Sequence, residues 1–238
     1  MDTTVISPHF DDAILSCGSI VSASTRIVTV YAGVPGPETK LSGWDRICGF
    51  PTAAAAALAR REEDDAACAR AGAEPVRLPY LDRPYAEDDG ADLPAALGEQ
   101  IRGGRVYLPA AIGGHPDHRA VRDAGLRACR DFDGEVFLYA DVPYACDRGW
   151  NAREADRPPR SRWDTALSEV RAQGYDIAEP DWRRLDAPAA ERKLALAKHY
   201  RSQLEVFRYR FSRITEPDGE LATEVAWAVA PAPRGEAR

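Results

Sequence analysis

Histidine and aspartate residues gather in two short segments of a chain that contains only four histidines. In the first segment, residues 7–12 (SPHFDD), His9 and Asp12 are three positions apart, with Asp11 beside them. If the chain turns into a helix here, the imidazole and the carboxylate can face the same crevice and form half of a site for a divalent metal. The segment could equally supply an aspartate N-cap and a strand-end histidine, because aspartate is a preferred cap residue.

A second segment, residues 110–118 (AAIGGHPDH), places His115 and His118 on either side of Pro116 and Asp117. The two preceding glycines allow the backbone to approach a ligand closely. An ordinary helix start explains the proline and the aspartate, which are common in a first turn, but it does not explain both histidines. Three of the four histidines thus fall in two similar segments. This favours a centre of two histidines and one aspartate with an open position, as in catalytic zinc sites.

Alternating strands and helices must hold these two segments. Apolar and β-branched runs predict strands over residues 3–7, 26–32, 76–81, 105–109 and 135–140, and helical periodicity predicts helices over 13–21, 52–71, 93–102 and 116–130. The alternation predicts an α/β fold: a Rossmann-like, doubly wound and mostly parallel sheet with helices on both faces. The histidine segments follow strands 3–7 and 105–109 at their carboxyl ends, where open α/β sheets bind ligands.

The rest of the chain is predicted to complete a single domain over residues 1–238, with the sheet core in 1–145. Residues 34–51 form a long loop rich in proline and glycine around Trp44, which is typical of a functional segment such as a lid. The part over 146–238 is predicted to contain a polar excursion over 147–162, a helix over 189–204 and a late edge strand over 221–229.

Composition excludes several classes of protein. The chain has 238 residues, with 31 basic and 38 acidic side chains and a net charge of −7. It is too hydrophobic for a disordered chain, and no apolar run approaches the roughly 18 residues of a membrane span. The sequence has no basic cluster, so nucleic acid is not an expected partner. It also has no secretory leader, which predicts a cytoplasmic location. Five widely spaced cysteines predict neither a disulfide framework nor a thiolate zinc site.

The two segments resemble the paired signatures of a known family. The sequences S-P-H-F-D-D-A and G-G-H-P-D-H-R-A-V are similar to those of the PIG-L (LmbE-like) family of metal-dependent N-deacetylases. The usual first motif is H-P-D-D, and Phe10 replaces the proline at a position that supplies no ligand. The resemblance extends from residue 3 to about residue 203, with weaker echoes in Arg60 and Glu63 and in residues 200–203 (YRSQ).

The resemblance implies roles for five residues. It implies that His9, Asp12 and His118 bind zinc, with ferrous iron or another divalent metal as the alternative, because two histidines and a carboxylate suit both. It also implies that Asp11 is the general base and that a protonated His115 stabilises the oxyanion. The chemistry is consistent: a divalent metal activates water and polarises an amide carbonyl, and a carboxylate beside that water can transfer its proton.

Asp117 and Tyr144 are further candidates for the chemistry. Asp117 either accepts a hydrogen bond from His115 and keeps that ring charged, or serves only as a first-turn helix charge. Relatives that act on cysteinyl-sugar precursors often carry a tyrosine two residues before the equivalent of His115. Gly113 occupies that position here, so a tyrosine-assisted step needs another donor, such as Tyr144.

The resemblance also points to substrate contacts. Arg60 and Asp82 are candidates for binding sugar hydroxyls, although both could be surface ion-pair residues. His199 lies outside both motifs and is interpreted as structural. A dinucleotide oxidoreductase is disfavoured, because the first strand leads into H-F-D-D rather than a glycine-rich phosphate loop.

The function expected from these residues is zinc-dependent removal of an N-acetyl or similar N-acyl group. The expected substrate is an amino sugar or a glycosylated small molecule in a biosynthetic pathway. One alternative is an amidase that acts on a larger N-acyl group or conjugate, since the same groups serve any amide. Another is a non-catalytic ligand-binding module that has kept its metal. Association into a homo-oligomer is left open.

Overall fold

The protein is described by a computed structural model that covers residues 2–83, 85–86, 90–147 and 160–233. At its centre is an eight-stranded sheet. The strands are β1 (Thr3–Ser7), β2 (Thr25–Thr29), β3 (Glu74–Arg77), β4 (Arg105–Pro109), β5 (Glu135–Tyr139), β6 (Tyr175–Ile177), β7 (Asp181–Arg184) and β8 (Thr223–Pro231). Strands β1 and β2 are almost fully buried, as expected for parallel strands that are covered on both faces.

The order of the strands creates a crevice between β1 and β4. The path through the sheet is β3-β2-β1-β4-β5-β8-β6, and β7 also pairs with β8. The strands from β3 to β5 are parallel, whereas β8 runs antiparallel to β5. From β1 the chain goes first to β2 and β3 on one side and later to β4 and β5 on the other. Ligands bind at such a switch point, outside the carboxyl ends of the strands.

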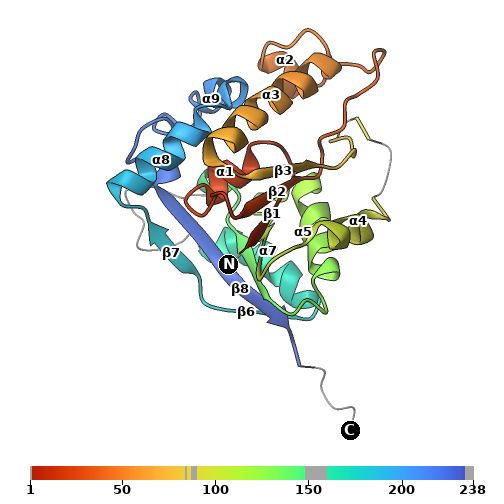
Figure 1. The fold of residues 1–238 in the computed structure, drawn as a ribbon, viewed down its shortest axis with the longest axis vertical. Helices are drawn as coiled ribbons and strands as arrows, with labels where there is room; N and C mark the ends of the chain where they lie inside the picture. Colours follow the sequence, from red (N-terminus) through yellow and green to blue (C-terminus); the bar gives the residue numbers. More distant parts are fainter. Residues whose placement is uncertain (1, 84, 87–89, 148–159, 234–238) are drawn as a thin grey trace.

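Helices cover both faces of the sheet (Figure 1). The described helices are α1 (Asp12–Cys17), α2 (Gly43–Ile47), α3 (Ala53–Ala71), α4 (Leu93–Gln100), α5 (Pro116–Ala128), α6 (Tyr144–Asp147), α7 (Arg160–Ala172), α8 (Ala187–Ala197) and α9 (Arg201–Phe207). Helices α1, α3 and α8 pack together on one face, and α4 and α5 pack against each other on the other (Figure 1). The predicted Rossmann-like, doubly wound sheet is therefore confirmed.

Helix α3 shows how the local sequence sets the ends of an element. Its N-cap residue, Thr52, accepts a hydrogen bond from the backbone N–H of Ala55, which satisfies one of the free donors of the first turn. At the other end Gly72 takes a left-handed conformation with φ of +73°, a common way for a helix to terminate. The helix predicted over 52–71 is confirmed to within one residue.

The part of the chain after residue 146 differs from its prediction in two ways. The strand predicted over 221–229 is confirmed as β8, but its predicted edge position is wrong: β8 pairs with β5 on one side and with β6 and β7 on the other, so it lies inside the sheet. The single helix predicted over 189–204 is divided into α8 and α9. Of the predicted polar excursion, residues 148–159 lie outside the described residues.

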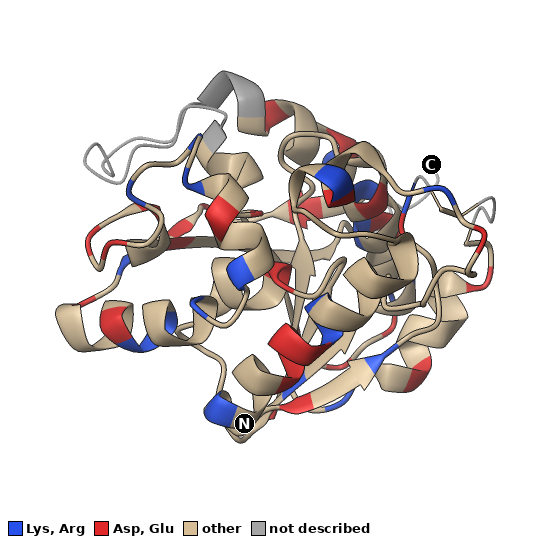
Figure 2. Ribbon diagram, turned by 90° about the horizontal axis from the view of Figure 1, so that it is seen from above, with Lys and Arg blue, Asp and Glu red and all other residues tan. Residues whose placement is uncertain are grey.

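Charge is spread over the molecule. Figure 2 shows basic and acidic residues interspersed along the helices and loops of the ribbon, and the described part has no basic stretch that stands apart. None of the described helices is both long and apolar enough to cross a membrane. None of the five cysteines, all of which lie in the described residues, is in a disulfide, and four of them are buried.

Candidate active site

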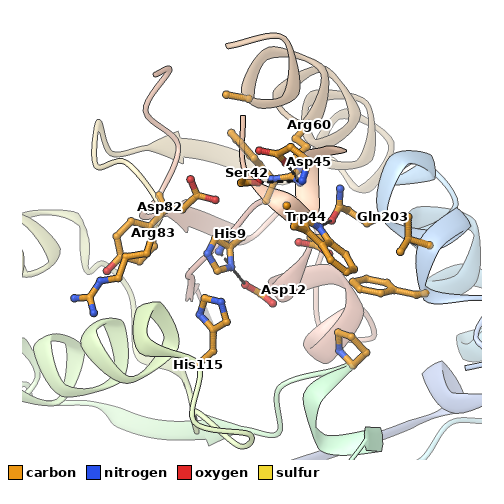
Figure 3. Close-up of a pocket in the computed structure, with 18 of the residues that line it drawn as sticks. His9, Asp12, Ser42, Trp44, Asp45, Arg60, Asp82, Arg83, His115 and Gln203 are labelled. Carbon is orange, nitrogen blue, oxygen red and sulfur yellow. Dashed lines mark hydrogen bonds and ion pairs between the residues drawn. The ribbon is translucent and has the colours of Figure 1, made fainter. Parts of the chain in front are cut away.

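A cavity of about 630 Å³ opens at the crevice between β1 and β4. The predicted site residues that line it are His9, Asp11, Asp12, Arg60, Asp82, His115 and Tyr144. Asp117 and His118 lie behind this lining and are fully buried. Figure 3 shows His9, Asp12 and His115 together on one side of the cavity, with Arg60 and Trp44 on another. The two histidine segments therefore meet in space, as their positions after β1 and β4 predicted.

Three donor atoms converge on one point in this cavity. Nδ1 of His9 lies 3.2 Å from Oδ2 of Asp12, and Nε2 of His118 lies 3.3 Å from the same oxygen. The His118 nitrogen is buried and makes no hydrogen bond within the described residues. A buried ring nitrogen that makes no hydrogen bond and faces a buried carboxylate has the features expected of a metal ligand. Two imidazoles and one carboxylate therefore fit a divalent cation with an open position.

The aspartates at the start of α1 do not cap the helix with their side chains. Asp11 occupies the N-cap position, but its carboxylate makes no cap hydrogen bond. The Oγ of Ser7 accepts from the backbone N–H of Ala13 instead, and the Asp12 carboxylate accepts from the backbone N–H of His9 at 2.9 Å. Because Ser7 satisfies a first-turn donor, Asp11 is left facing the cavity.

Each histidine of the triad is held from behind by a second carboxylate. Nε2 of His9 lies 3.1 Å from Oδ2 of Asp117, and Nδ1 of His118 lies 2.6 Å from Oδ1 of Asp141. Both aspartates are fully buried. Such carboxylates fix the orientation of a ligating ring and the position of its proton. Burial lowers the pKa of both rings, but the surrounding carboxylates outweigh it: Asp117 and Asp12 raise the pKa of His9, and Asp12 and Asp141 raise that of His118.

Asp141 is the functional candidate that sequence reasoning missed. It lies two residues after the end of β5, and its other oxygen accepts from the backbone N–H of Ile112. The available signal was its position at the carboxyl end of a third parallel strand, next to the strand that carries the second histidine segment.

Asp117 does not accept a hydrogen bond from His115, which was one of the two roles considered for it. Its carboxylate is 4.0 Å from Nδ1 of His115, too far for a hydrogen bond, and instead lies against His9. The backbone N–H of Asp117 points at that same His115 nitrogen, at 3.3 Å. Burial, together with the nearby charges of His9 and His118, lowers the pKa of His115 to about 4. This shift favours a neutral ring over the protonated ring expected from the sequence, and a neutral ring that accepts at Nδ1 would carry its proton on Nε2.

Asp11 has an environment suited to taking up a proton. Burial is the main cause that raises its pKa to about 6, and the neighbouring charge of Asp12 adds to it, while His9 and Arg60 oppose the shift. A raised carboxyl pKa brings the group closer to neutral pH, where a general base works best.

Arg60 and Asp82 both line the cavity but differ in their partners. The guanidinium of Arg60 forms a short ion pair with the buried Asp45, whose other oxygen accepts from the hydroxyl of Tyr85. The Asp82 carboxyl pKa is raised, mainly by burial, and the charges of His9 and Arg60 oppose the shift. Asp82 projects into the cavity (Figure 3). Arg60 therefore shapes the loop around α2, whereas Asp82 faces the open space.

Tyr144 lies in the site beside the histidines, whereas His199 does not line the cavity. The Tyr144 ring packs 4.9 Å from the His118 ring and 5.6 Å from the His115 ring, centroid to centroid. Burial raises the pKa of its phenol well above the usual value. His199 lies in the turn between α8 and α9 and is not among the residues that line the cavity.

The weaker sequence echoes are explained by contacts of α9. Glu63 accepts hydrogen bonds from the backbone N–H and the hydroxyl of Ser202. Tyr200 donates to the buried Asp64 at 2.8 Å, and Gln203 accepts from the indole N–H of Trp44 at 2.9 Å. The segment over 200–203 thus ties α9 to α3 and to the loop that carries α2, which form one wall of the cavity.

Three solved structures resemble the chain over nearly its whole length. A triple mutant of a deacetylase involved in the teicoplanin biosynthetic pathway is 26% identical, with a TM-score of 0.74 over 99% of this chain and 100% of that one. The A40926 pseudoaglycone deacetylase is 30% identical, with a TM-score of 0.70 over 98% of each chain. The zinc-inhibited form of teicoplanin deacetylase is 25% identical, with a TM-score of 0.72 over 99% and 100%.

The family of the chain follows from its sequence as well. No curated protein sequence gave a significant match. The model of the PIG-L family, described as GlcNAc-PI de-N-acetylase, matches residues 4–129, which is more than half of the chain and includes both histidine segments. The chain belongs to the PIG-L family and is a metal-dependent deacetylase.

Proposed function

We propose that this deacetylase removes an N-acetyl group from an amino sugar that is part of a glycosylated small molecule in a biosynthetic pathway. The observation that carries this proposal is the cavity-facing carboxylate of Asp11, which has no capping role and lies next to the His9, Asp12 and His118 triad. A carboxylate in this place can act on a water molecule without being a metal ligand.

His9, Asp12 and His118 would hold one divalent cation, which we expect to be zinc, with ferrous iron as the alternative. The chemistry supplied by such a cation is polarisation of the amide carbonyl and activation of a water molecule near neutral pH. Asp117 and Asp141 keep the two rings oriented toward it through the ring nitrogens that face away.

Asp11 transfers the proton, and His115 stabilises the negative charge of the intermediate. Asp11 takes the proton of the attacking water and later delivers it to the departing amine. The carbonyl oxygen becomes negative in the tetrahedral intermediate, and the Nε2–H of His115 donates a hydrogen bond to it. One such donor is typically worth about 3–4 kcal/mol of the barrier. A neutral ring suffices for this, since Nδ1 is already occupied by the backbone N–H of Asp117.

The size and walls of the cavity support a substrate larger than an acetylated monosaccharide. A volume of about 630 Å³ lies in the middle of the range for drug-sized ligands, about 300–1,000 Å³. Asp82 offers a carboxylate to sugar hydroxyls, while the rim bears Trp44 and Tyr209, which are 40% and 94% exposed. The resemblance to the teicoplanin and A40926 pseudoaglycone deacetylases supports a glycosylated substrate of this kind.

The test is an acetate-release assay on metal-loaded enzyme. We expect release from an aryl N-acetylglucosaminide to exceed release from free N-acetylglucosamine, because the aryl group reaches the aromatic rim. Faster cleavage of the matched N-octanoyl glucosaminide would favour the amidase alternative instead. Failure to cleave any of these amides, with a cation bound, would contradict the proposed substrate class.

A further inference from the structure

Asp82 lines the cavity from a segment that lies outside the described helices and strands. Its carboxylate faces the open space (Figure 3), and within the described residues it makes no hydrogen bond or ion pair. A carboxylate without a partner keeps its acceptor capacity for a ligand, and sugar hydroxyls are donors that it can bind. Because no neighbour holds the carboxylate itself, its position in the cavity depends on the backbone that carries it.

Tyr85 ties that backbone to the wall of the cavity. Its backbone N–H donates to the carbonyl of Asp82 at 2.8 Å. Its hydroxyl donates to the buried carboxylate of Asp45 and accepts from the backbone N–H of Ser42 at 3.0 Å. The other oxygen of Asp45 pairs with Arg60 of α3. One phenol therefore connects the segment of Asp82 to the loop that carries α2 and, through Asp45, to α3.

A second contact holds the segment on the side of the metal triad. The backbone N–H of Arg83 donates to Oδ2 of Asp117 at 3.2 Å, and the same oxygen lies 3.1 Å from Nε2 of His9. Asp82 thus lies between a contact to the metal-ligand side and a contact to the cavity wall. Removal of the Tyr85 hydroxyl breaks only the second of these. It should therefore shift Asp82 while leaving the triad in place.

We propose that Tyr85 is a positioning residue that places the carboxylate of Asp82 against one ring hydroxyl of the amino sugar. The two residues together would then determine which amino sugars the enzyme accepts. The proposal rests on the proposed function, because it requires an amino-sugar substrate. A hydrogen bond to a charged acceptor contributes about 10–100-fold to an equilibrium or a rate ratio, which is the size of the discrimination expected between sugars with and without that hydroxyl.

The test compares acetate release from an aryl N-acetylglucosaminide with release from analogues that each lack one ring hydroxyl. In the metal-loaded wild type, loss of the hydroxyl bound by Asp82 should lower kcat/KM about 10–100-fold. D82A should be insensitive to that hydroxyl. Y85F should lose most of the sensitivity, and on the parent substrate its KM should rise more than its kcat falls. A wild type that is insensitive to every hydroxyl, or a Y85F as sensitive as the wild type, would overturn the proposal.

A double-variant cycle shows whether Tyr85 acts through Asp82. If it does, adding Y85F to D82A should cost nothing further in kcat/KM, because residues that depend on each other are not additive. Factors that multiply would make the two residues independent and contradict the proposal.

Y107F is the matched control, because Tyr107 lies in β4, stacks on Phe137 and does not line the cavity. It should keep the sensitivity of the wild type to each hydroxyl. The thermal unfolding temperature and the zinc content of Y85F should match those of the wild type. Loss of the fold or of the cation in Y85F would make Tyr85 a structural residue and would also contradict the proposal.

Hydrogen exchange of the backbone N–H groups of Arg83 and Tyr85 distinguishes failure of this proposal from failure of the proposed function. Loosening of the segment should make both groups exchange faster in Y85F than in the wild type and Y107F. If that is observed but the wild type releases no acetate from any glucosaminide, the positioning role stands and the proposed function fails. If acetate release is normal and Y85F changes neither the exchange nor the sensitivity to hydroxyls, the proposed function stands and the positioning role fails.

Discussion

Asp141 holds the ring nitrogen of His118 that faces away from the cation site. Its Oδ1 lies 2.6 Å from Nδ1 of His118, and both residues are fully buried. The D141N variant should lower the affinity for the cation by about 10–100-fold, since an amide is a poorer partner for that ring nitrogen. The measurement is competition with a chelator of known affinity. D181N is the matched control, because Asp181 is exposed and pairs only with Arg183 among the residues described. Equal affinities in D141N and D181N would contradict this role.

Replacement of Asp11 should affect turnover and leave cation binding unchanged. Because it is expected to move a proton and not to hold the cation, D11N should keep its metal content and lose about 100–10,000-fold in kcat. Elemental analysis and acetate release on the same preparation measure the two effects. Loss of the cation in D11N would instead make Asp11 a ligand.

The resemblance to the family assigned His9, Asp12 and His118 from two short motifs, and the structure brings these three residues together. Sequence reasoning could not reach the tautomer of His115, which depends on the backbone N–H of Asp117. Nor could it assign Asp117 to His9, since that contact joins two separate strand ends and depends on how β1 and β4 lie side by side.

At the scale of elements, α9 is tied to α3 through a buried carboxylate. Asp64 accepts from Tyr200 and forms an ion pair with Arg77. Burial raises its pKa from 3.8 to about 6, although Arg77 and Tyr200 oppose the shift. A carboxyl group whose pKa is raised on folding contributes stability that is fully present below the unfolded pKa and is lost as pH rises through the folded value.

The D64N variant removes this titration. Between pH 4 and 7 the free energy of unfolding of the wild type should fall relative to D64N, by up to about 3 kcal/mol for a shift of roughly two pKa units. Urea denaturation of both proteins across this range gives the difference. A constant difference between the two proteins would show that Asp64 titrates normally in the folded state.

A hydrogen bond across the cavity wall joins the loop that carries α2 to α9. Trp44 donates from its indole to Gln203, and its ring packs 5.7 Å from that of Phe207. W44F keeps an aromatic ring and removes the donor, which should cost about 1 kcal/mol of loop ordering. We expect KM to rise several-fold with kcat little changed. A fall in kcat without a change in KM would place Trp44 in the chemistry.

Helix α2 could not be predicted from the sequence. It spans Gly43–Ile47, a single turn capped by Ser42, and is too short for periodicity to reveal. The break between α8 and α9 was hidden for a related reason, since the apolar pattern continues through residues 198–200 although the helix does not.

At the scale of the whole molecule, β8 joins the late part of the chain to the core. It pairs with β5, β6 and β7 and brings Val225, Trp227 and Val229 into the buried interior. We therefore propose that residues 1–238 form one cooperative unit, with 146–238 as a necessary part. The full chain should unfold in one thermal transition, and truncation after residue 222 should prevent folding. Circular dichroism of both chains tests this, and two separate transitions would contradict it.

The contact between Gly113 and Tyr144 constrains how this active site can change. Gly113 has φ of +98°, and a Cβ built on it would lie 3.0 Å from the Cβ of Tyr144. Any side chain at position 113 would therefore need a different backbone conformation, since L residues rarely adopt this φ. Shortening Tyr144 would not remove the contact, because every residue except glycine keeps its Cβ. A path to a side chain at position 113 must therefore change the backbone of this turn and not only the residue that faces it.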